Sequence, residues 1–238
     1  MSLSFTIITL FPDMYPGPLG CSLLGKALAS GVWRLKTIDL RTYGLGRYGS
    51  VDDTCYGGGA GMVIRADVVD AALRDAMVGL HNPKMIYMTP RGRAMTQSDF
   101  QTYSQCTHDV VILCGRYEGV DQRVLDFWDF QELCLGDFVL CGGDIPAMAF
   151  IEGCIRLLPG VLHNPDSCIS ESFQSPLLEH PLYTRPATWN GVSVPEVLMS
   201  GHHGQIKAWQ QDQSKAHTQK VRPDLWQKFL ESHEKTPE

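Results

Sequence analysis

The feature that most constrains the fold is an apolar run that ends abruptly in a glycine turn. Residues 110–113 are consecutive apolar residues, Cys114 extends the run, and Gly115 and Gly119 enclose an Arg-Tyr-Glu segment. A short apolar run bounded by turn residues is typical of a strand buried on both faces of a sheet. Glycines at the end of such a strand let a ligand approach the backbone closely. We therefore expect an α/β fold in which the turn exposes charged and aromatic side chains beside a ligand: Arg116, Tyr117, Glu118 and Asp121.

The same pattern occurs at two other places in the chain. The apolar run 84–89 ends in Thr-Pro-Arg-Gly-Arg, and the run 132–140 leads into Gly142, Gly143 and Asp144. Because the carboxyl ends of parallel strands meet at one edge of a sheet, these ends can surround a single ligand. We predict one pocket for a ligand of adenosine size, built from the strand ends 89–93, 115–119 and 136–143.

Strands and helices are predicted to alternate through the first two thirds of the chain. The patterns indicate strands at 4–11, 34–40, 84–89, 109–114 and 132–140, with helices at 18–30, 66–78, after Thr96, at 120–128 and at 146–157. Alternation of this kind predicts an α/β domain with a mainly parallel sheet. Further along, a polar, turn-rich stretch precedes helical patterns at 195–200, 203–219 and 223–232. We predict a domain over 1–162, a flexible linker over 163–175 and a small helical domain over 176–238.

Charge and cysteine content limit the class of protein. The formal net charge is −6, and residues 1–162 hold 13 basic against 17 acidic residues, which argues against tight electrostatic binding of nucleic acid by this part. Residues 176–238 hold seven of each, including Lys207, Lys215, Lys220, Arg222 and Lys228. The eight cysteines contain no C-x-x-C pair, so we interpret them as reduced core residues. The first apolar run is too short to span a membrane, and we expect a cytoplasmic protein.

Three segments allow both a structural and a functional interpretation. The glycine loop at 57–61 lacks the lysine of a P-loop; it is either a flexible turn or, as we favour, a backbone that packs against a planar base or cofactor. Arg156, among apolar neighbours, either extends to solvent or stabilises developing negative charge in the pocket. Glu171 lies between two serines and is either a helix cap, which the residues alone favour, or a general base.

The order and spacing of these motifs resemble the bacterial tRNA (guanine-N1)-methyltransferases, the TrmD family of the SPOUT class, over nearly the whole chain. The likeness rests on Phe11–Tyr15, Asp52–Met62, Leu113–Asp121, Gly136–Leu140, Gly142 and Gly143, Pro146–Met148, Tyr183–Pro186, and Gly201 and His202. Members of that family use S-adenosylmethionine to methylate N1 of the guanine immediately 3′ of the anticodon. The resemblance therefore implies a methyltransferase with this cofactor and a tRNA substrate.

The resemblance also implies a deep trefoil knot and an obligate homodimer, neither of which composition reveals. It implies cofactor contacts at Tyr87, Met88, Thr89, Pro90, Gly115, Tyr117, Glu118, Gly119, Leu135, Gly136, Asp137, Leu140, Gly142 and Gly143. It places substrate contacts at Tyr56, Gly57, Gly58, Gly59 and Glu179, and the catalytic arginine at Arg156.

One catalytic position departs from the family pattern. The family's general base is an aspartate followed by Ser-Phe, and that position here is Glu171, one methylene longer; Asp166 offers a carboxylate nearby at a different spacing. As base, Glu171 would accept the N1 proton of guanine while Arg156 stabilises the charge that develops on O6. The family depends on magnesium, which the carboxylate oxygens of Glu118, Glu171 or Glu179 would suit.

Two other functions compete with this interpretation. A knotted tRNA-binding protein with weak or no methyl transfer is favoured only by the glutamate at position 171. A dinucleotide-dependent dehydrogenase is disfavoured because the G-x-G-x-x-G motif is missing. Intact strand ends for a cofactor favour the enzyme.

Overall fold

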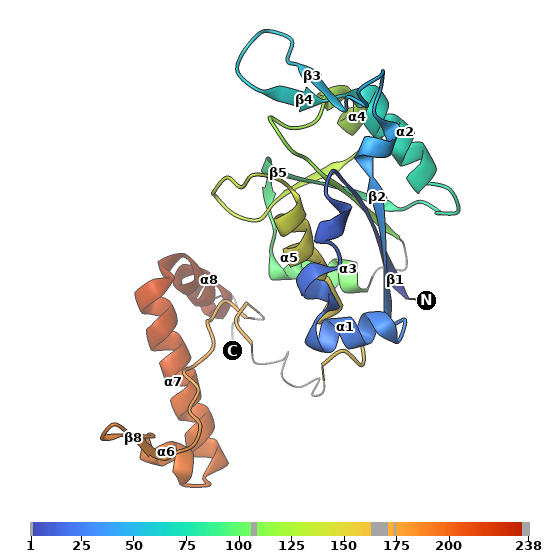
Figure 1. Cartoon of the computed structure of the whole chain (residues 1–238). Helices are drawn as coiled ribbons and strands as arrows, with labels where there is room; N and C mark the ends of the chain where they lie inside the picture. Colours follow the sequence, from blue (N-terminus) through green and yellow to red (C-terminus); the bar gives the residue numbers. More distant parts are fainter. Residues whose placement is uncertain (1, 106–108, 163–170, 174, 235–238) are drawn as a thin grey trace. The chain divides into compact units, whose positions relative to one another are not determined.

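A five-stranded parallel sheet lies at the centre of the amino-terminal part of the chain in the computed structural model, which describes residues 2–105, 109–162, 171–173 and 175–234 (Figure 1). The strands occur in the order β2-β1-β6-β5-β7, and every neighbouring pair is parallel. Their bounds are β1 Leu3–Thr9, β2 Trp33–Asp39, β5 Lys84–Ala94, β6 Val110–Cys114 and β7 Gln131–Cys134. The predicted α/β fold with a mainly parallel sheet is confirmed.

Helices cover both faces of this sheet. Because successive side chains of a strand point to opposite faces, a strand such as β6 contributes to both of the cores that the helices cover. On β6, Val110, Ile112 and Cys114 belong to a core shared with α1, α3 and α5, whereas Val111 and Leu113 belong to a second core shared with α2 and α4. The helices are α1 Ser22–Ala29, α2 Ala66–Ala76, α3 Gln97–Ser104, α4 Gln122–Phe127 and α5 Asp144–Ile155. Apolar side chains on both faces explain why β6 has no polar residue.

Three boundaries differ from the expected ones. β7 ends at Cys134 rather than at residue 140, because the chain turns at once: the Cys134 thiol donates to the Gly136 carbonyl and the Phe138 amide donates to the same oxygen. The helix expected at 18–30 begins only at Ser22, after the 3-10 turn η2 Gly17–Gly20 and an extended Cys21. β5 runs on to Ala94, but its pairing with β7 shifts between Met88 and Arg93, so that residues 89–92 leave the ladder.

The glycine loop at 57–61 is the tip of a hairpin that the sequence patterns did not indicate. Its strands are β3 Asp52–Thr54 and β4 Met62–Ile64, which pair antiparallel. Gly57, Gly58 and Gly59 all have positive φ, and a Cβ added to any of them would meet nothing within 4 Å. The glycines therefore satisfy the backbone conformation of the tip, and no other described part of the chain packs on Gly57, Gly58 or Gly59. Other short elements of this part are η1 Pro12–Met14 and η3 Leu40–Tyr43.

The chain divides into two compact units, Met1–His163 and Asn164–Glu238. The second unit contains α6 Glu196–Met199, α7 His203–Val221, α8 Pro223–Glu234 and a small hairpin of β8 Thr188–Trp189 with β9 Val192–Ser193. The hairpin was not predicted. Most of the expected linker, residues 163–170 and 174, lies outside the described residues.

None of the helices in the described part of the chain is both long enough and apolar enough to cross a bilayer.

Candidate functional site

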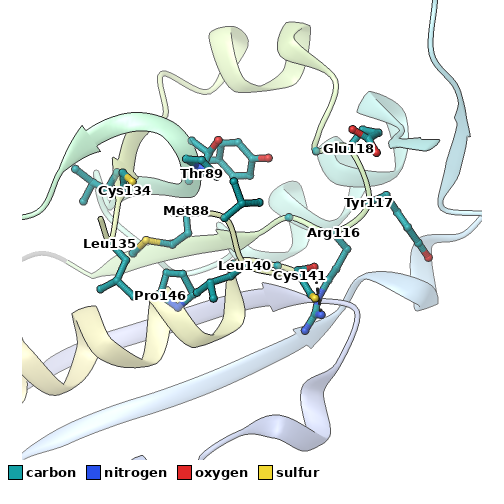
Figure 2. Close-up of a pocket in the computed structure, with 18 of the residues that line it drawn as sticks. Met88, Thr89, Arg116, Tyr117, Glu118, Cys134, Leu135, Leu140, Cys141 and Pro146 are labelled. Atoms are coloured by element: carbon teal, nitrogen blue, oxygen red, sulfur yellow. Dashed lines mark hydrogen bonds between the residues drawn. The ribbon is translucent and has the colours of Figure 1, made fainter. Parts of the chain in front are cut away.

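A cleft of about 210 Å³ opens where β5, β6 and β7 end. Its walls come from residues 87–90, from the turn 115–119 and from the segment 133–143, with Pro146 of α5 beside them. Figure 2 shows Met88, Leu135, Leu140 and Pro146 gathered around this hollow, with the side chain of Tyr117 pointing away from it. The three predicted strand ends therefore meet in one cleft.

The cleft depends on a chain segment that crosses the end of β5. Because β5 lies between β7 and β6 in the sheet, the segment 135–142 must pass over β5 to reach β6. There the Gly143 amide donates to the Gly115 carbonyl at 3.0 Å. A Cβ on Gly143 would lie 3.0 Å from the Cα of Cys114, and one on Gly115 would lie 2.7 Å from the Tyr87 hydroxyl. A side chain at Gly115 would collide with the buried Tyr87 ring, and one at Gly143 would press on the backbone of Cys114.

The residues that leave the β5 ladder form the opposite wall. Thr89 and Pro90 line the cleft, and Gly92 packs on the backbone of β7, where an added Cβ would lie 2.5 Å from the Glu132 carbonyl carbon. The Arg91 guanidinium donates to Gln122 at 2.6 Å and to Glu132 at 3.1 Å, both outside the cleft. The irregularity in β5 thus places Thr89 and Pro90 at the hollow.

Arg116 does not present its charge to the cleft as the sequence led us to expect. It borders the cleft, but its guanidinium turns back to the carboxylate of Asp144, with Nη2 at 2.6 Å and Nε at 3.0 Å from Oδ2. Asp121 is likewise half-buried and accepts from the Arg123 guanidinium and amide. Of the four side chains expected to be exposed, Tyr117 and Glu118 are. The turn has fewer free charges than its sequence indicates.

Buried groups beside the cleft keep their protons. Burial is the main cause that raises the pKa of the Tyr87 hydroxyl, and the same cause raises the pKa of the Cys114 thiol and of the Tyr15 hydroxyl, both near Asp144. Loss of these protons would create uncompensated charge in a region of low dielectric. Cys114, Tyr15 and Tyr87 therefore supply neutral hydrogen-bonding groups rather than a nucleophile or a base.

Most of the predicted cofactor residues line the cleft. They are Tyr87, Met88, Thr89, Pro90, Gly115, Tyr117, Glu118, Gly119, Leu135, Leu140, Gly142 and Gly143, whereas Gly136 and Asp137 are not among the lining residues. Reasoning from sequence missed Leu133, Cys134 and Pro146, which also line it. Arg116, Phe138, Val139 and Cys141 line it too; they belong to the predicted strand ends but not to the contacts that the resemblance implies. The apolar run Phe138–Leu140 was the available signal: we took it as a buried strand, but all three side chains are exposed.

The glycine hairpin is bonded directly to the turn that follows β6. The Glu118 amide donates to the Met62 carbonyl, the Ile64 amide donates to the Gly119 carbonyl, and Gly61 packs against the Glu118 side chain. At the tip, the Tyr56 ring is 94% exposed. The hairpin therefore offers an exposed aromatic side chain and is bonded to the turn 115–119.

The remaining predicted residues lie outside the lining of the cleft. Arg156 directly follows the last residue of α5 and is half-buried. Glu171 and Glu179 belong to the second unit, and there the Glu179 amide donates to the Ser172 hydroxyl at 2.9 Å. This bond holds the backbone of Glu179 next to Ser172, the residue that follows Glu171. Asp166 lies outside the described residues.

Metal and thiol chemistry find little support in the part of the chain that is described. There, His, Cys, Asp and Glu side chains form no group of three or more that could hold a metal ion, so we derive no step through magnesium. The cysteines described are free thiols. Cys114, Cys134 and Cys154 are buried, but Cys21, Cys55 and Cys141 are exposed, so the interpretation of the cysteines as core residues is wrong for those three.

Comparison with known proteins gives a consistent result over nearly the whole chain. Residues 3–228 match the model of the family described as tRNA (Guanine-1)-methyltransferase TrmD. The chain is 54% identical to a protein of Ruegeria sp. (strain TM1040) over 97% of this chain and 94% of that protein. It is 56% identical to one of Ruegeria pomeroyi over 93% and 91%, and 52% identical to one of Gluconobacter oxydans over 97% of each. All three relatives bear the name tRNA (guanine-N(1)-)-methyltransferase.

Proposed function

The chain belongs to the tRNA (guanine-1)-methyltransferase TrmD family, and on that premise we propose that its cleft binds S-adenosylmethionine for methyl transfer to N1 of the guanine 3′ of the anticodon in tRNA. The family and the names of the relatives make the chain a tRNA (guanine-N1)-methyltransferase, rather than a tRNA-binding protein without this activity. The observation that carries the proposal for the cofactor is the meeting of three glycine-containing strand ends around one hollow.

The lining of the cleft fits this cofactor. Residues 115–119, Leu135 and 138–143 line the hollow, and we propose that their backbone groups bind the polar edges of adenine and ribose. Met88, Leu135, Leu140 and Pro146, which Figure 2 shows around the hollow, would supply apolar contact for the purine. A segment that crosses the end of β5 and returns to Gly115 is part of the trefoil knot that we propose for this unit. S-adenosylmethionine, when bound, supplies a methyl group on a sulfonium centre.

The chain's own residues have to activate the guanine, whose N1 carries a proton. We propose that the Glu171 carboxylate accepts this proton and that the Arg156 guanidinium stabilises the negative charge that develops on O6. With its proton on Glu171 and the charge on O6 held by Arg156, N1 would have a lone pair available for the methyl group that the bound cofactor would supply. Tyr56, Gly57, Gly58, Gly59 and Glu179 are proposed to contact the tRNA, and Tyr56 at the hairpin tip has a ring free to stack on a base.

The proposed assembly is a homodimer that acts in the cytoplasm, where its tRNA substrate is made. The exposed apolar side chains Phe138, Val139 and Leu140 beside the cleft support this assembly, because a second subunit would remove them from water. Covering them would also complete one wall of the cleft.

Replacement of Gly115 by Val tests the cofactor site. The new side chain would collide with the Tyr87 hydroxyl and fill the space where the ligand meets the backbone, so affinity for S-adenosylmethionine should fall by at least about tenfold, or 1.4 kcal/mol. Calorimetric titration measures this affinity, and circular dichroism checks that the fold persists. Gly204→Val is the matched control, because a Cβ at Gly204 meets nothing within 4 Å.

Wild-type protein should also transfer labelled methyl to tRNA that has guanine 3′ of the anticodon, and not to the same tRNA with adenine there. Undiminished cofactor binding by Gly115→Val would place the cofactor elsewhere.

A further inference from the structure

We propose that the ion pair between Arg116 and Asp144 is a clamp that sets the spacing of the two loops walling the cofactor cleft, and that Asp144 and Thr9 are therefore positioning residues for methyl transfer. This inference rests on the proposed function, because it takes the cleft as the site of S-adenosylmethionine. It concerns residues to which neither the resemblance nor the proposed mechanism gives a role.

The carboxylate of Asp144 is wholly buried and fully engaged. Asp144, the first residue of α5, is 0% exposed. Its Oδ2 accepts from Nη2 and Nε of Arg116 at 2.6 and 3.0 Å, and its Oδ1 accepts from the Thr9 hydroxyl at 2.6 Å and from the Tyr15 hydroxyl at 3.4 Å. A carboxylate in such a place is tolerated only because each oxygen has donors and the charge has a partner.

The guanidinium of Arg116 is held on several sides. Beyond Asp144, its Nη1 donates to the Cys141 carbonyl at 3.5 Å, its Nη2 contacts the Met14 sulfur at 3.5 Å, and its Cζ lies 4.4 Å from the centre of the Phe11 ring. Arg116 follows Gly115 in the turn after β6, whereas Cys141 and Asp144 belong to the segment that leads into α5. One side chain thus ties the turn after β6 to the loop that returns from β7.

These two connected segments are the walls of the cleft. Gly115 and Gly119 line it on one side, and Cys141, Gly142 and Gly143 line it on the other. Gly142 packs so closely on the Arg116 side chain that an added Cβ would overlap it, and Gly143 donates to the Gly115 carbonyl. The ion pair and this backbone hydrogen bond together hold the two segments, and the ion pair is the part of the connection made by side chains.

Loss of one partner should move the walls rather than unfold the chain. Asp144→Asn keeps the shape of the side chain but leaves the Arg116 charge in a half-buried place without its counter-charge. Because Arg116 already borders the cleft, we expect the guanidinium to move toward it and to displace the turn 115–119. Because methyl transfer requires alignment, a displacement of about 1 Å costs about 10²-fold in rate.

A second ion pair in the same unit provides a matched control. Asp99 is also buried, pairs with both terminal nitrogens of Arg93, and accepts from the Thr96 amide and hydroxyl at the start of α3. None of these residues lines the cleft. Asp99→Asn removes a buried, arginine-paired carboxylate of the same type without touching the walls.

The test compares full-length wild type, Asp144→Asn and Asp99→Asn. We measure the dissociation constant for S-adenosylmethionine by calorimetry, kcat and KM for both substrates in a methyl-transfer assay, and the midpoint of thermal unfolding. Asp144→Asn should raise the dissociation constant and the KM for S-adenosylmethionine by about tenfold and lower kcat by about 10²-fold, with KM for tRNA unchanged. Asp99→Asn should lower only the thermal midpoint.

A milder variant keeps the test decisive if Asp144→Asn does not fold. Thr9→Val removes one donor to Asp144 and leaves the ion pair, so it should give the same split between the two KM values with an effect of a fewfold. Arg116→Lys should bind the cofactor more tightly than Arg116→Met, because lysine keeps the positive charge. It should bind the cofactor less tightly than wild type, because lysine cannot make the paired hydrogen bonds of arginine.

The inference is wrong if Asp144→Asn and Thr9→Val resemble Asp99→Asn, with reduced stability and wild-type cofactor affinity and kcat. Failure of the wild-type protein to bind S-adenosylmethionine would instead refute the proposed function.

Discussion

The two units of the chain are built on different amounts of core. In the first unit, buried side chains fill two cores, one on each face of the sheet. Among the described residues of the second unit, Thr218 alone is buried. Its hydroxyl accepts from the Leu178 amide and donates to the Ser214 carbonyl, and the Tyr183 and Trp209 rings lie 6.2 Å apart.

This difference indicates a division of labour. A densely packed unit holds backbone groups in fixed positions, as the binding of a small cofactor requires. A unit with little core loses few buried contacts when its conformation changes on binding. A large, charged partner can then supply contacts that the unit's own side chains do not make. We therefore expect the first unit to bind S-adenosylmethionine by itself and the second to act on tRNA.

Removal of the second unit should have the largest effect. A chain that ends after residue 162 keeps both cores and the cleft, so it should bind S-adenosylmethionine as the full chain does. It lacks Glu171 and every lysine of the second unit, so methylation of tRNA should disappear. Calorimetry and a methyl-transfer assay measure the two properties. Robust tRNA methylation by this form would contradict both the assignment of tRNA to the second unit and the assignment of Glu171 as the base.

Replacement of Glu171 should have the next largest effect. Glu171→Gln keeps the shape but cannot accept a proton, so single-turnover methylation should fall by about 10²–10⁴-fold with cofactor affinity nearly unchanged. Glu171→Asp restores the carboxylate with a shorter reach and should retain substantial activity. If Glu171→Gln is as active as wild type, the base is another group, and Asp166 becomes the first candidate.

Removal of lysine charge from α7 should have the smallest effect. Lys215→Ala combined with Lys220→Ala should weaken tRNA binding and lower its dependence on salt by about one to two units of log–log slope, because fewer phosphates are contacted. Cofactor affinity should not change. Arg222→Ala is the control, because the Arg222 guanidinium is already paired with Asp224 at 2.7 Å and should contact phosphate less than the two lysines do. The hydrogen bond to the Asp224 carboxylate raises the pKa of this guanidinium. Equal slopes for wild type and the double variant would exclude these lysines from the interface.

Much of the cleft follows from local sequence. Unbroken apolar runs specify strands that are buried on both faces, and the glycines after them mark where the backbone is approached closely. Both signals are short-range, and they identified the strands that end at the cleft together with Gly115, Gly142 and Gly143. The family resemblance, rather than any such pattern, supplied the roles of Arg156 and Glu171, which remain predictions.

Other features of the site depend on partners far apart in the chain. Whether Phe138–Leu140 forms a strand depends on the turn at Gly136, and whether Arg116 faces a ligand depends on Asp144. Asp144 in turn is satisfied by Thr9, 135 residues away. Periodicity in the sequence predicts which side chains of a regular strand or helix are buried, and it fails where, as at Phe138–Leu140, the element does not form. The direction of a polar side chain follows from which donors and acceptors the fold brings within hydrogen-bonding distance, so only the tertiary structure decided it.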